Sequence, residues 1–347
     1  MKTTCLISSH NYVKFVGEAI EGALRQSTPF DEIIVVDDGS TDGSLELLEN
    51  AYAGHPTVQV IAKVNEGQLS CFNEGFAHAT GDIVFFLDAD DIYDPNYVER
   101  ALQEYRKYSK CDFLFCGCRF FGDREGVSLR FPESRDLGYS VIRTTYSKAW
   151  IGGVTSTLSL RRSVLEKILP LPFVDDWRTR ADDCLVFGAS LVGARKRFLA
   201  EPLVRYRVHS RNHFYGSKPD ATANYRRRLA VNRLFEHLQR QQCYNVEQLA
   251  DFPHREFKTI ESPSFDVLRE YARICMRART SMLRRISCIL SMTHHYFSTS
   301  RRTHPALGHE TMPAANGSFS PRLFSPDTIA QPDSSSEQTL QEGRKAA

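Results

Sequence analysis

The sequence of 347 residues lacks several patterns that would place it in a well-defined class. No two cysteines are separated by two residues, so the spacing typical of a structural zinc site is missing. The nine cysteines are too scattered for a disulfide scaffold, and we expect reduced thiols in a cytosolic protein. No run of eighteen apolar residues occurs, so we expect no membrane-spanning helix. Residues 1–5 lack the apolar core of a signal peptide, so we expect no export.

Glycine is also missing where a dinucleotide-binding domain requires it. The first predicted strand, residues 4–8, leads into Ser9, His10 and Asn11, whereas that class of domain carries Gly-x-Gly-x-x-Gly at this turn. The absence excludes a dinucleotide-binding domain of the Rossmann type. The overall composition, 41% hydrophobic and 25% charged residues, is ordinary for a globular protein.

What the sequence does contain is an apolar run, Ile83 to Leu87, that leads directly into Asp88, Asp90 and Asp91. Such a run predicts a strand that is buried on both faces. Carboxylates crowded at the end of a buried strand are unfavourable unless a cation neutralises them. We therefore predict a site for Mg²⁺ or Mn²⁺, which takes its remaining ligands from phosphates and water. The alternative, a helix that starts at Asp94-Pro95 and runs to about residue 107, does not account for the preceding acids.

The first hundred residues alternate between strand and helix patterns. Apolar runs at residues 4–8, 32–36, 58–62 and 83–87 are separated by segments with helical periodicity. This order predicts an α/β fold with a mostly parallel, Rossmann-like sheet flanked by helices. Because parallel strands end at the same edge of a sheet, Ser8–Asn11, Asp37-Asp38 and Asp88–Asp91 are expected to converge there.

The rest of the chain changes in character along its length. Residues 151–160 predict a glycine-led strand, Asp182-Asp183 the start of a helix, and residues 198–208 a last strand. Basic helices follow from about residue 225, including a helical segment over 265–297. From about residue 303 proline, serine, glycine and glutamine dominate without periodicity. We expect a catalytic domain over 1–215, a basic helical extension over 216–300 and a disordered tail over 301–347.

Several motifs, in the same order along residues 3–212, resemble those of the family 2 glycosyltransferases, which have the GT-A fold. They are Ser8-Ser9-His10-Asn11-Tyr12, the run from Ile33 to Asp42, Asn65-Glu66-Gly67 leading to Asn73, Leu87-Asp88-Ala89-Asp90-Asp91, Asp182-Asp183 and Tyr206-Arg207-Val208-His209-Ser210. The chain departs from the usual family pattern in three places. It has Ser8-Ser9-His10-Asn11 in place of Pro-Thr-Tyr-Asn, Asp182 in place of glutamate, and Cys184 in place of an aromatic residue.

The resemblance implies a site for a nucleotide-diphosphate sugar, with a UDP-sugar favoured. Its donor-binding residues would be Ser8, His10, Asn11, Asp38, Asn65, Gly67 and Asp88. Asp38 would contact the nucleobase, and Asp88 would lie by the ribose. Asp90, with Asp88 and His209, would bind Mn²⁺ or Mg²⁺ under the diphosphate. A solvated histidine at a strand end is the alternative for His209.

The resemblance also places Asp183 at the position of the catalytic base in inverting members, beside Asp182. Chemistry agrees, because transfer to a hydroxyl needs a carboxylate that takes the proton. Two adjacent carboxylates raise the pKa of one of the pair, which suits that role. The alternative is structural, since the first turn of a helix favours acidic residues without any catalysis.

The function that follows is transfer of a sugar, with inversion, to a glycan, a lipid-linked glycan or another hydroxyl acceptor. Two alternatives are a sugar-nucleotide pyrophosphorylase, whose glycine-rich phosphate loop is missing, and a non-catalytic homologue that binds glycan or a partner. Residues 265–302 carry many arginines and few acids, so we expect loose contact with the cytoplasmic face of the inner membrane. Nucleic acid is not an expected partner, because no recognised binding module accompanies the arginines.

Overall fold

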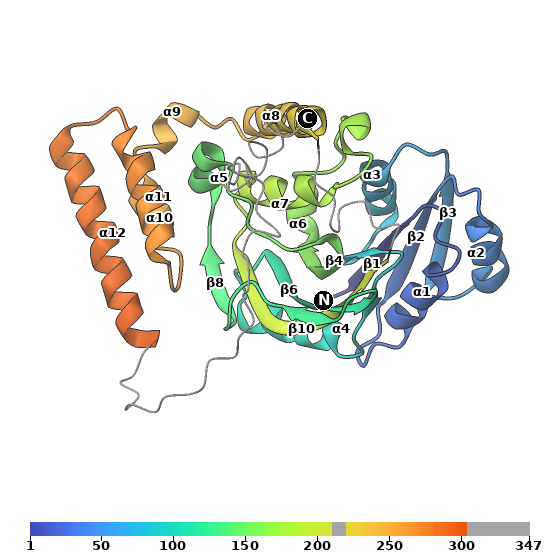
Figure 1. Ribbon diagram of the computed structural model, residues 1–347. Coiled ribbons are helices and arrows are strands. Elements are labelled where there is room, and N and C mark those ends of the chain that lie inside the picture. The colour runs from blue at the N-terminus through green and yellow to red at the C-terminus, as the bar shows by residue number, and fades with distance from the viewer. Residues whose placement is uncertain (210–219, 304–347) are drawn as a thin grey trace, which may run out of the picture. The chain divides into compact units, whose positions relative to one another are not determined.

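The computed structural model of the protein describes residues 1–209 and 220–303, and the side chains of the last four of these are not considered. Its central feature is a ten-stranded sheet in the order β3-β2-β1-β4-β9-β6-β10-β5, with β7 beside β6 and β8 beside β10 (Figure 1). The strands are β1 (Thr3–Ser9), β2 (Glu32–Asp38), β3 (Val58–Lys63), β4 (Ile83–Asp88), β5 (Ile92–Tyr93), β6 (Phe113–Gly122), β7 (Gly126–Ser128), β8 (Arg135–Gly138), β9 (Leu158–Arg161) and β10 (Lys196–Val208).

The parallel half of the sheet brings the polar strand ends together. β1 pairs in parallel with both β2 and β4, and β2 pairs in parallel with β3. In this register Ser8 lies opposite Asp88, and Ser9 lies opposite Asp37. β9 enters antiparallel between β4 and β6, and β10 runs parallel to β6. The predicted mixed α/β fold is therefore confirmed, together with the expected convergence of strand ends at one edge.

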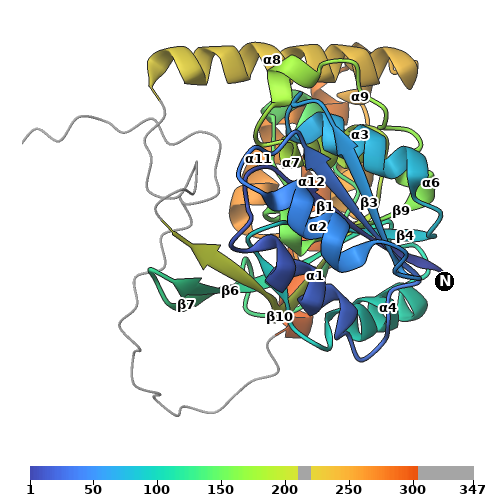
Figure 2. The same cartoon turned by 90° about the vertical axis from the view of Figure 1, so that its right-hand side faces the viewer.

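Helices cover both faces of the parallel strands. α1 (Val16–Leu24), α2 (Ser44–Tyr52) and α4 (Tyr97–Lys107) share one core cluster with Ile7, Val35 and Phe85. The opposite face of the strands meets α3 (Gln68–His78), where the rings of Phe72 and Phe86 lie 5.0 Å apart. Figure 2 looks onto α1 and α2 beside these strands. Burial on both faces explains why the strands read as continuous apolar runs rather than as alternating patterns.

The remaining helices come after β8 in the chain, three of them before β10 and the others after it. They are α5 (Val141–Ser147), α6 (Arg162–Leu165), α7 (Asp182–Leu191), α8 (Ala221–Gln241), α9 (Val246–Leu249), α10 (Pro253–Phe257), α11 (Phe265–Met276) and α12 (Met282–Thr303), with 3₁₀ turns η1 (Thr155–Thr157) and η2 (Val174–Trp177). Within the described residues, no helix combines the length and apolar character that crossing a membrane requires.

Two element boundaries differ from those predicted. The helix expected from Asp94-Pro95 begins at Tyr97, and residues 95–96 before it form a turn in which the Tyr97 N–H donates to Asp94 O at 3.0 Å. The strand expected over 151–160 starts at Leu158. Thr157 precedes it and turns the chain, since both its backbone N–H and its hydroxyl donate to Val154 O.

The segment predicted as one helical stretch over 265–297 is two helices, α11 and α12. They pack together with α10 around a second core cluster. The cluster comprises Phe257, Ile260, Leu268, Tyr271, Cys275, Cys288 and Met292. The predicted tail over 301–347 lies, from residue 304 onward, outside the described residues, as does the segment 210–219 within the closing motif. The domain boundaries at 215 and 300 stay a prediction.

Candidate functional site

The acidic end of β4 forms the centre of the candidate site. The Gln68 side chain donates from Nε2 to Asp88 Oδ1 at 2.8 Å. Burial, reinforced by the charges of Asp90 and Asp182, raises the pKa of Asp88 to about 8. Neighbouring carboxylates repel one another when both are ionised, so a bound cation stabilises their ionised forms. The residues present therefore fit the cation expected from the sequence.

Asp91 is held inside the protein by its own partners. Its side chain is 1% exposed, and it accepts hydrogen bonds from Ser156 Oγ at 2.6 Å and from the Arg207 backbone N–H at 2.8 Å. Burial and the neighbouring charges of Asp90 and Asp88 raise its pKa well above the usual range. Asp91 thus joins the end of β4 to β10. This structural role accounts for Asp91, which a helix start at Asp94-Pro95 did not.

Asp90, which follows β4, and His209, which follows β10, come together although they are 119 residues apart in the sequence. His209 Nε2 lies 3.0 Å from Asp90 Oδ2, and the Phe15 ring packs against the imidazole at 5.0 Å between centroids. Arg207 Nε donates to Asp90 O at 2.8 Å and fixes the backbone there. This arrangement agrees with the predicted metal-ligand pair.

The described residues contain no group of three or more histidine, cysteine or acidic side chains arranged to hold a metal ion. Asp90 and His209 would supply only two protein ligands. Mg²⁺ and Mn²⁺ at phosphate-binding sites commonly use one or two carboxylates and take the other ligands from substrate phosphates and water. The donor set therefore fits a cation that binds together with a diphosphate.

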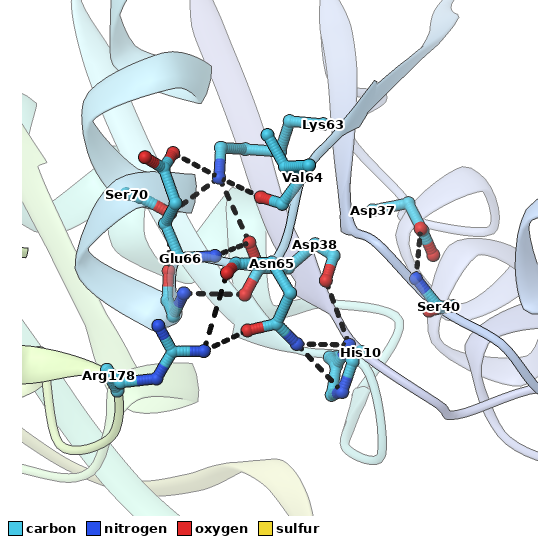
Figure 3. A network of polar contacts seen from close by, with 11 residues as sticks. His10, Asp37, Asp38, Ser40, Lys63, Val64, Asn65, Glu66, Ser70 and Arg178 are labelled. Carbon is cyan, nitrogen blue, oxygen red and sulfur yellow. Dashed lines mark hydrogen bonds and ion pairs between the residues drawn. The ribbon is translucent and has the colours of Figure 1, made fainter. Parts of the chain in front are cut away.

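Asp38 organises the loop between β3 and α3. Its buried carboxylate accepts hydrogen bonds from Lys63 Nζ at 3.0 Å and from the backbone N–H groups of Glu66 at 2.9 Å and Gly67 at 2.7 Å (Figure 3). A carboxylate offers about four acceptor positions, so these three donors do not saturate it. Asp38, which is 3% exposed, therefore fixes the loop and retains acceptor capacity beyond these three donors.

His10 and Asn65 face each other across this loop. His10 Nδ1 lies 2.9 Å from Asp38 O, an atom that only accepts, so Nδ1 carries the hydrogen. Asn65 Nδ2 then donates to His10 Nε2 at 3.0 Å, and Arg178 donates to Asn65 Oδ1 (Figure 3). The chain places three predicted donor-binding residues, His10, Asp38 and Asn65, in one polar network.

Asn11 joins the ends of β1 and β2. It has a left-handed φ of 59°, its backbone N–H donates to Ser40 Oγ at 2.9 Å, and its Oδ1 accepts from the Thr41 N–H at 2.8 Å. Ser8, 8% exposed, lies beside Asp88 in the sheet register. Both residues lie at the predicted edge, and Asn11 holds the loops there in place.

Gln68 is a residue of the site that the sequence patterns did not reveal. Its Nε2 binds Asp88, and its Oε1 accepts from the Ala181 N–H at 2.9 Å. One side chain therefore connects the end of β4 to the start of α7. Next to it, Gly67 has a φ of +95°, and an added Cβ would come within 2.3 Å of Arg178 Cα. Sequence spacing does not predict these contacts, because Asp88 lies 20 residues and Ala181 lies 113 residues after Gln68.

The two acids at the start of α7 have different surroundings. Asp183 is 0% exposed and accepts two hydrogen bonds from Arg227, from Nε at 2.8 Å and from Nη2 at 2.9 Å. Arg180 Nε lies 3.7 Å from the same carboxylate. Asp182 is partly exposed, and one of its oxygens accepts from the Asp183 N–H at 3.1 Å.

The charges around Asp182 shift its pKa in opposite directions. Burial and the neighbouring charge of Asp183 raise the pKa of Asp182 to about 7, although Arg180 and Arg227 lower it. Arg227 belongs to α8 and lies within a run of three arginines, residues 226–228. Its partner could not be predicted from that run, since it lies 44 residues earlier.

The comparisons with known proteins agree with this geometry. Residues 4–169 match the sequence model described as glycosyl transferase family 2. Over these residues the chain belongs to this family. Its matched region contains His10, Asp38, Asn65 and the acidic end of β4, whereas Arg178 and the residues at the start of α7 lie beyond it.

Two relatives and one solved structure are similar to this chain. An uncharacterized glycosyltransferase of Nostoc is 35% identical over 61% of this chain and 66% of its own length. The chondroitin synthase of Escherichia coli is 38% identical over 35% of this chain and 17% of its own. The chain thus covers less than two thirds of either relative. The structure of S. aureus TarS 1–349 in complex with UDP-GlcNAc matches with a TM-score of 0.52 and 17% identity, over 87% of this chain and 91% of that one, which shows a shared fold.

Proposed function

We propose that the protein transfers a sugar from a UDP-sugar to a hydroxyl group of a glycan or lipid-linked acceptor, with inversion at the anomeric carbon. The observation that carries this proposal is the meeting of Asp90, His209 and the network around Asp38 at one edge of the sheet. Membership of family 2 supports the reaction class. A UDP-sugar is the kind of molecule held by the solved structure that shares the fold.

Different residues of the chain would have different roles in this reaction. Asp90 and His209, with Asp88 beside them, would hold Mn²⁺ or Mg²⁺. When bound, such a cation supplies Lewis-acid neutralisation of the charge that develops on the leaving diphosphate. Asp38 and its neighbours orient the nucleotide, and a carboxylate at the start of α7 takes the acceptor proton. By position within the family that carboxylate is Asp183, with Asp182 next to it.

A thermal-shift screen tests the donor. We expect UDP-sugars with Mn²⁺ to raise the melting temperature, whereas GDP- and dTDP-sugars with the same metal raise it less. At a concentration of about 100 times the dissociation constant, a ligand adds about 2.7 kcal/mol of stability by mass action. A protein stabilised by no nucleotide sugar contradicts the proposal. Stabilisation by UDP-sugars without release of UDP favours the non-catalytic homologue.

We also propose that the protein attaches loosely to the cytoplasmic face of the inner membrane through residues 265–302. One side of α12 packs on the second core cluster. The side chains of Leu283, Ile286, Leu290 and Phe297, which recur at helical spacing, are exposed to between 49% and 81%. Arg284 is exposed on the same helix, and Arg277 and Arg279 precede it. An apolar stripe bordered by cations is typical of a helix that lies on anionic lipid.

Sedimentation with liposomes tests this attachment. We expect the protein to pellet with vesicles that contain anionic lipid, and to be released by salt, because the arginines are attracted to the surface charge. Leu283→Glu should reduce the pelleted fraction, because it puts a carboxylate on the apolar stripe. Val127→Glu, the same kind of change at a 52% exposed position of β7, is the matched control. Equal pelleting with neutral and anionic vesicles, or none, contradicts the proposal.

A further inference from the structure

We infer that Arg207 is a positioning residue of the proposed metal site, and that it fixes the backbone from which the Asp90 carboxylate reaches the cation. This inference rests on the proposed function and adds one residue to it. It depends on contacts that join the end of β10 to the acidic loop after β4 and to the start of α1.

Arg207 binds the acidic loop through both its side chain and its backbone. Its Nε donates to Asp90 O at 2.8 Å, and its backbone N–H donates to Asp91 Oδ1 at 2.8 Å. Asp91 is 1% exposed and also accepts from Ser156 Oγ at 2.6 Å, so its position is well defined. Arg207 therefore holds two consecutive residues of the loop.

The end of β10 thus contacts Asp90 at two separate points. Arg207 binds its backbone carbonyl, and His209 Nε2 lies 3.0 Å from its carboxylate oxygen Oδ2. The ring of Phe15 contacts both, at 4.6 Å from the guanidinium carbon of Arg207 and 5.0 Å from the His209 ring centroid. Mg²⁺ tolerates little departure from octahedral geometry, so its ligands need a defined separation. Arg207 holds the backbone of one proposed ligand against the strand that leads to the other.

Two phenyl rings restrain the guanidinium group of Arg207. Its central carbon lies 4.6 Å from the ring centroid of Phe15 and 4.4 Å from that of Phe121. Phe121 is the residue of β6 opposite Arg207 in the parallel register, and Phe15 directly precedes α1. A guanidinium group is planar, stacks on aromatic rings and donates several hydrogen bonds in a fixed fork, whereas an ammonium group has neither the plane nor the fork. The site therefore requires arginine rather than any cation.

The outer end of the Arg207 side chain forms an ion pair. Its Nη2 donates to Glu18 Oε2 at 2.8 Å, in the first turn of α1. The Glu18 side chain is 56% exposed, and that of Arg207 is 13% exposed. An ion pair with an exposed partner contributes little, so the binding of Asp90 O and the two rings carry the positioning role. The substitution Arg207→Lys preserves the charge for this ion pair and removes the planar fork.

Titration with Mn²⁺ in the presence of UDP tests the inference, with the rise in melting temperature as the readout. We expect Arg207→Lys to raise the Mn²⁺ concentration that gives half of the maximal rise by about 10- to 100-fold, the usual effect of changing a residue that orients a metal ligand. The release of UDP from UDP-GlcNAc, UDP-glucose and UDP-galactose, measured in parallel, should require more Mn²⁺ by a similar factor.

Two further variants complete the test. Arg205→Lys is the matched control, because it makes the same change two residues earlier on β10, at a 43% exposed side chain whose Nε lies 3.3 Å from Asp94 Oδ1. It should leave the Mn²⁺ requirement unchanged. Phe121→Leu removes one of the two rings and leaves the arginine present, so it should raise the Mn²⁺ requirement by a smaller factor, about 2- to 5-fold. This variant tests the inference even where Arg207→Lys does not fold.

The possible outcomes separate the inference from the proposed function. Wild-type protein that shows no Mn²⁺-dependent rise with UDP and releases no UDP overturns the proposed function, and the inference falls with it. If the wild-type protein responds and the folded Arg207 and Phe121 variants need no more Mn²⁺, the inference alone is overturned. A lower melting temperature without ligand at an unchanged Mn²⁺ requirement identifies a purely structural role for Arg207 and overturns it too, as does an equal shift in Arg205→Lys.

Discussion

Replacing Asp90 with asparagine is expected to lower the release of UDP from a UDP-sugar by about 10³-fold or more, since a catalytic cation contributes several kcal/mol to the transition state. The physical reason is the small number of protein ligands. Asp90 is the carboxylate paired with His209 at 3.0 Å, with Asp88 beside it, and the described residues hold no group of three histidine, cysteine or acidic side chains arranged to bind a metal that could compensate for its loss. The neutral amide would be a much weaker ligand for a hard cation.

Kinetics as a function of Mn²⁺ concentration measure this effect. The Asp90→Asn variant should require far more Mn²⁺ for half-maximal activity and should lose the Mn²⁺-dependent thermal shift seen with UDP. Asp123→Asn is the matched control, because it makes the same change at an exposed residue whose backbone binds the end of β10. It should leave both measurements unchanged. Full turnover in Asp90→Asn, or an equal loss in the control, contradicts the metal site.

Replacing Arg227 with methionine is expected to lower the free energy of unfolding by about 3–5 kcal/mol, the usual effect of removing one partner from a buried ion pair. The variant leaves the Asp183 carboxylate, 0% exposed, with Arg180 at 3.7 Å as its one remaining counter-charge among the described residues. Adding Asp183→Asn to the methionine variant should recover part of the loss, because no unpaired charge then remains inside the protein.

Denaturant unfolding of the single and double variants measures this coupling. Arg228→Met, at an exposed position on the same helix, is the matched control and should change the free energy by less than about 0.5 kcal/mol. If Arg227→Met and Arg228→Met have equal effects, then the ion pair contributes nothing particular to stability. Additive effects of the two changes in the double variant would lead to the same conclusion.

The parts of the site that lie at strand ends could be predicted from the sequence. Ser8, Asp38 and Asp88 each close a buried apolar run, and parallel strands bring such ends to one edge. The fold class followed from the same alternation of strand and helix. These signals are local in the sequence. The structure retains the predicted strands because they are buried on both faces.

What could not be predicted depends on contacts between distant segments. Gln68 looks like an ordinary first residue of a helix, yet its amide joins Asp88 to Ala181. Arg227 looks like a solvated arginine, yet it binds Asp183. The sequence shows which side chains carry charge, but only the packing of α8 on α7 decides which charge is neutralised.

The position of the family match along the chain has a practical consequence. The matched residues, 4–169, hold Asp38 and Asp90, whereas Asp182 and Arg227 follow later. A fragment that ends at residue 169 would therefore keep the whole family match and lack the ion pair between Asp183 and Arg227.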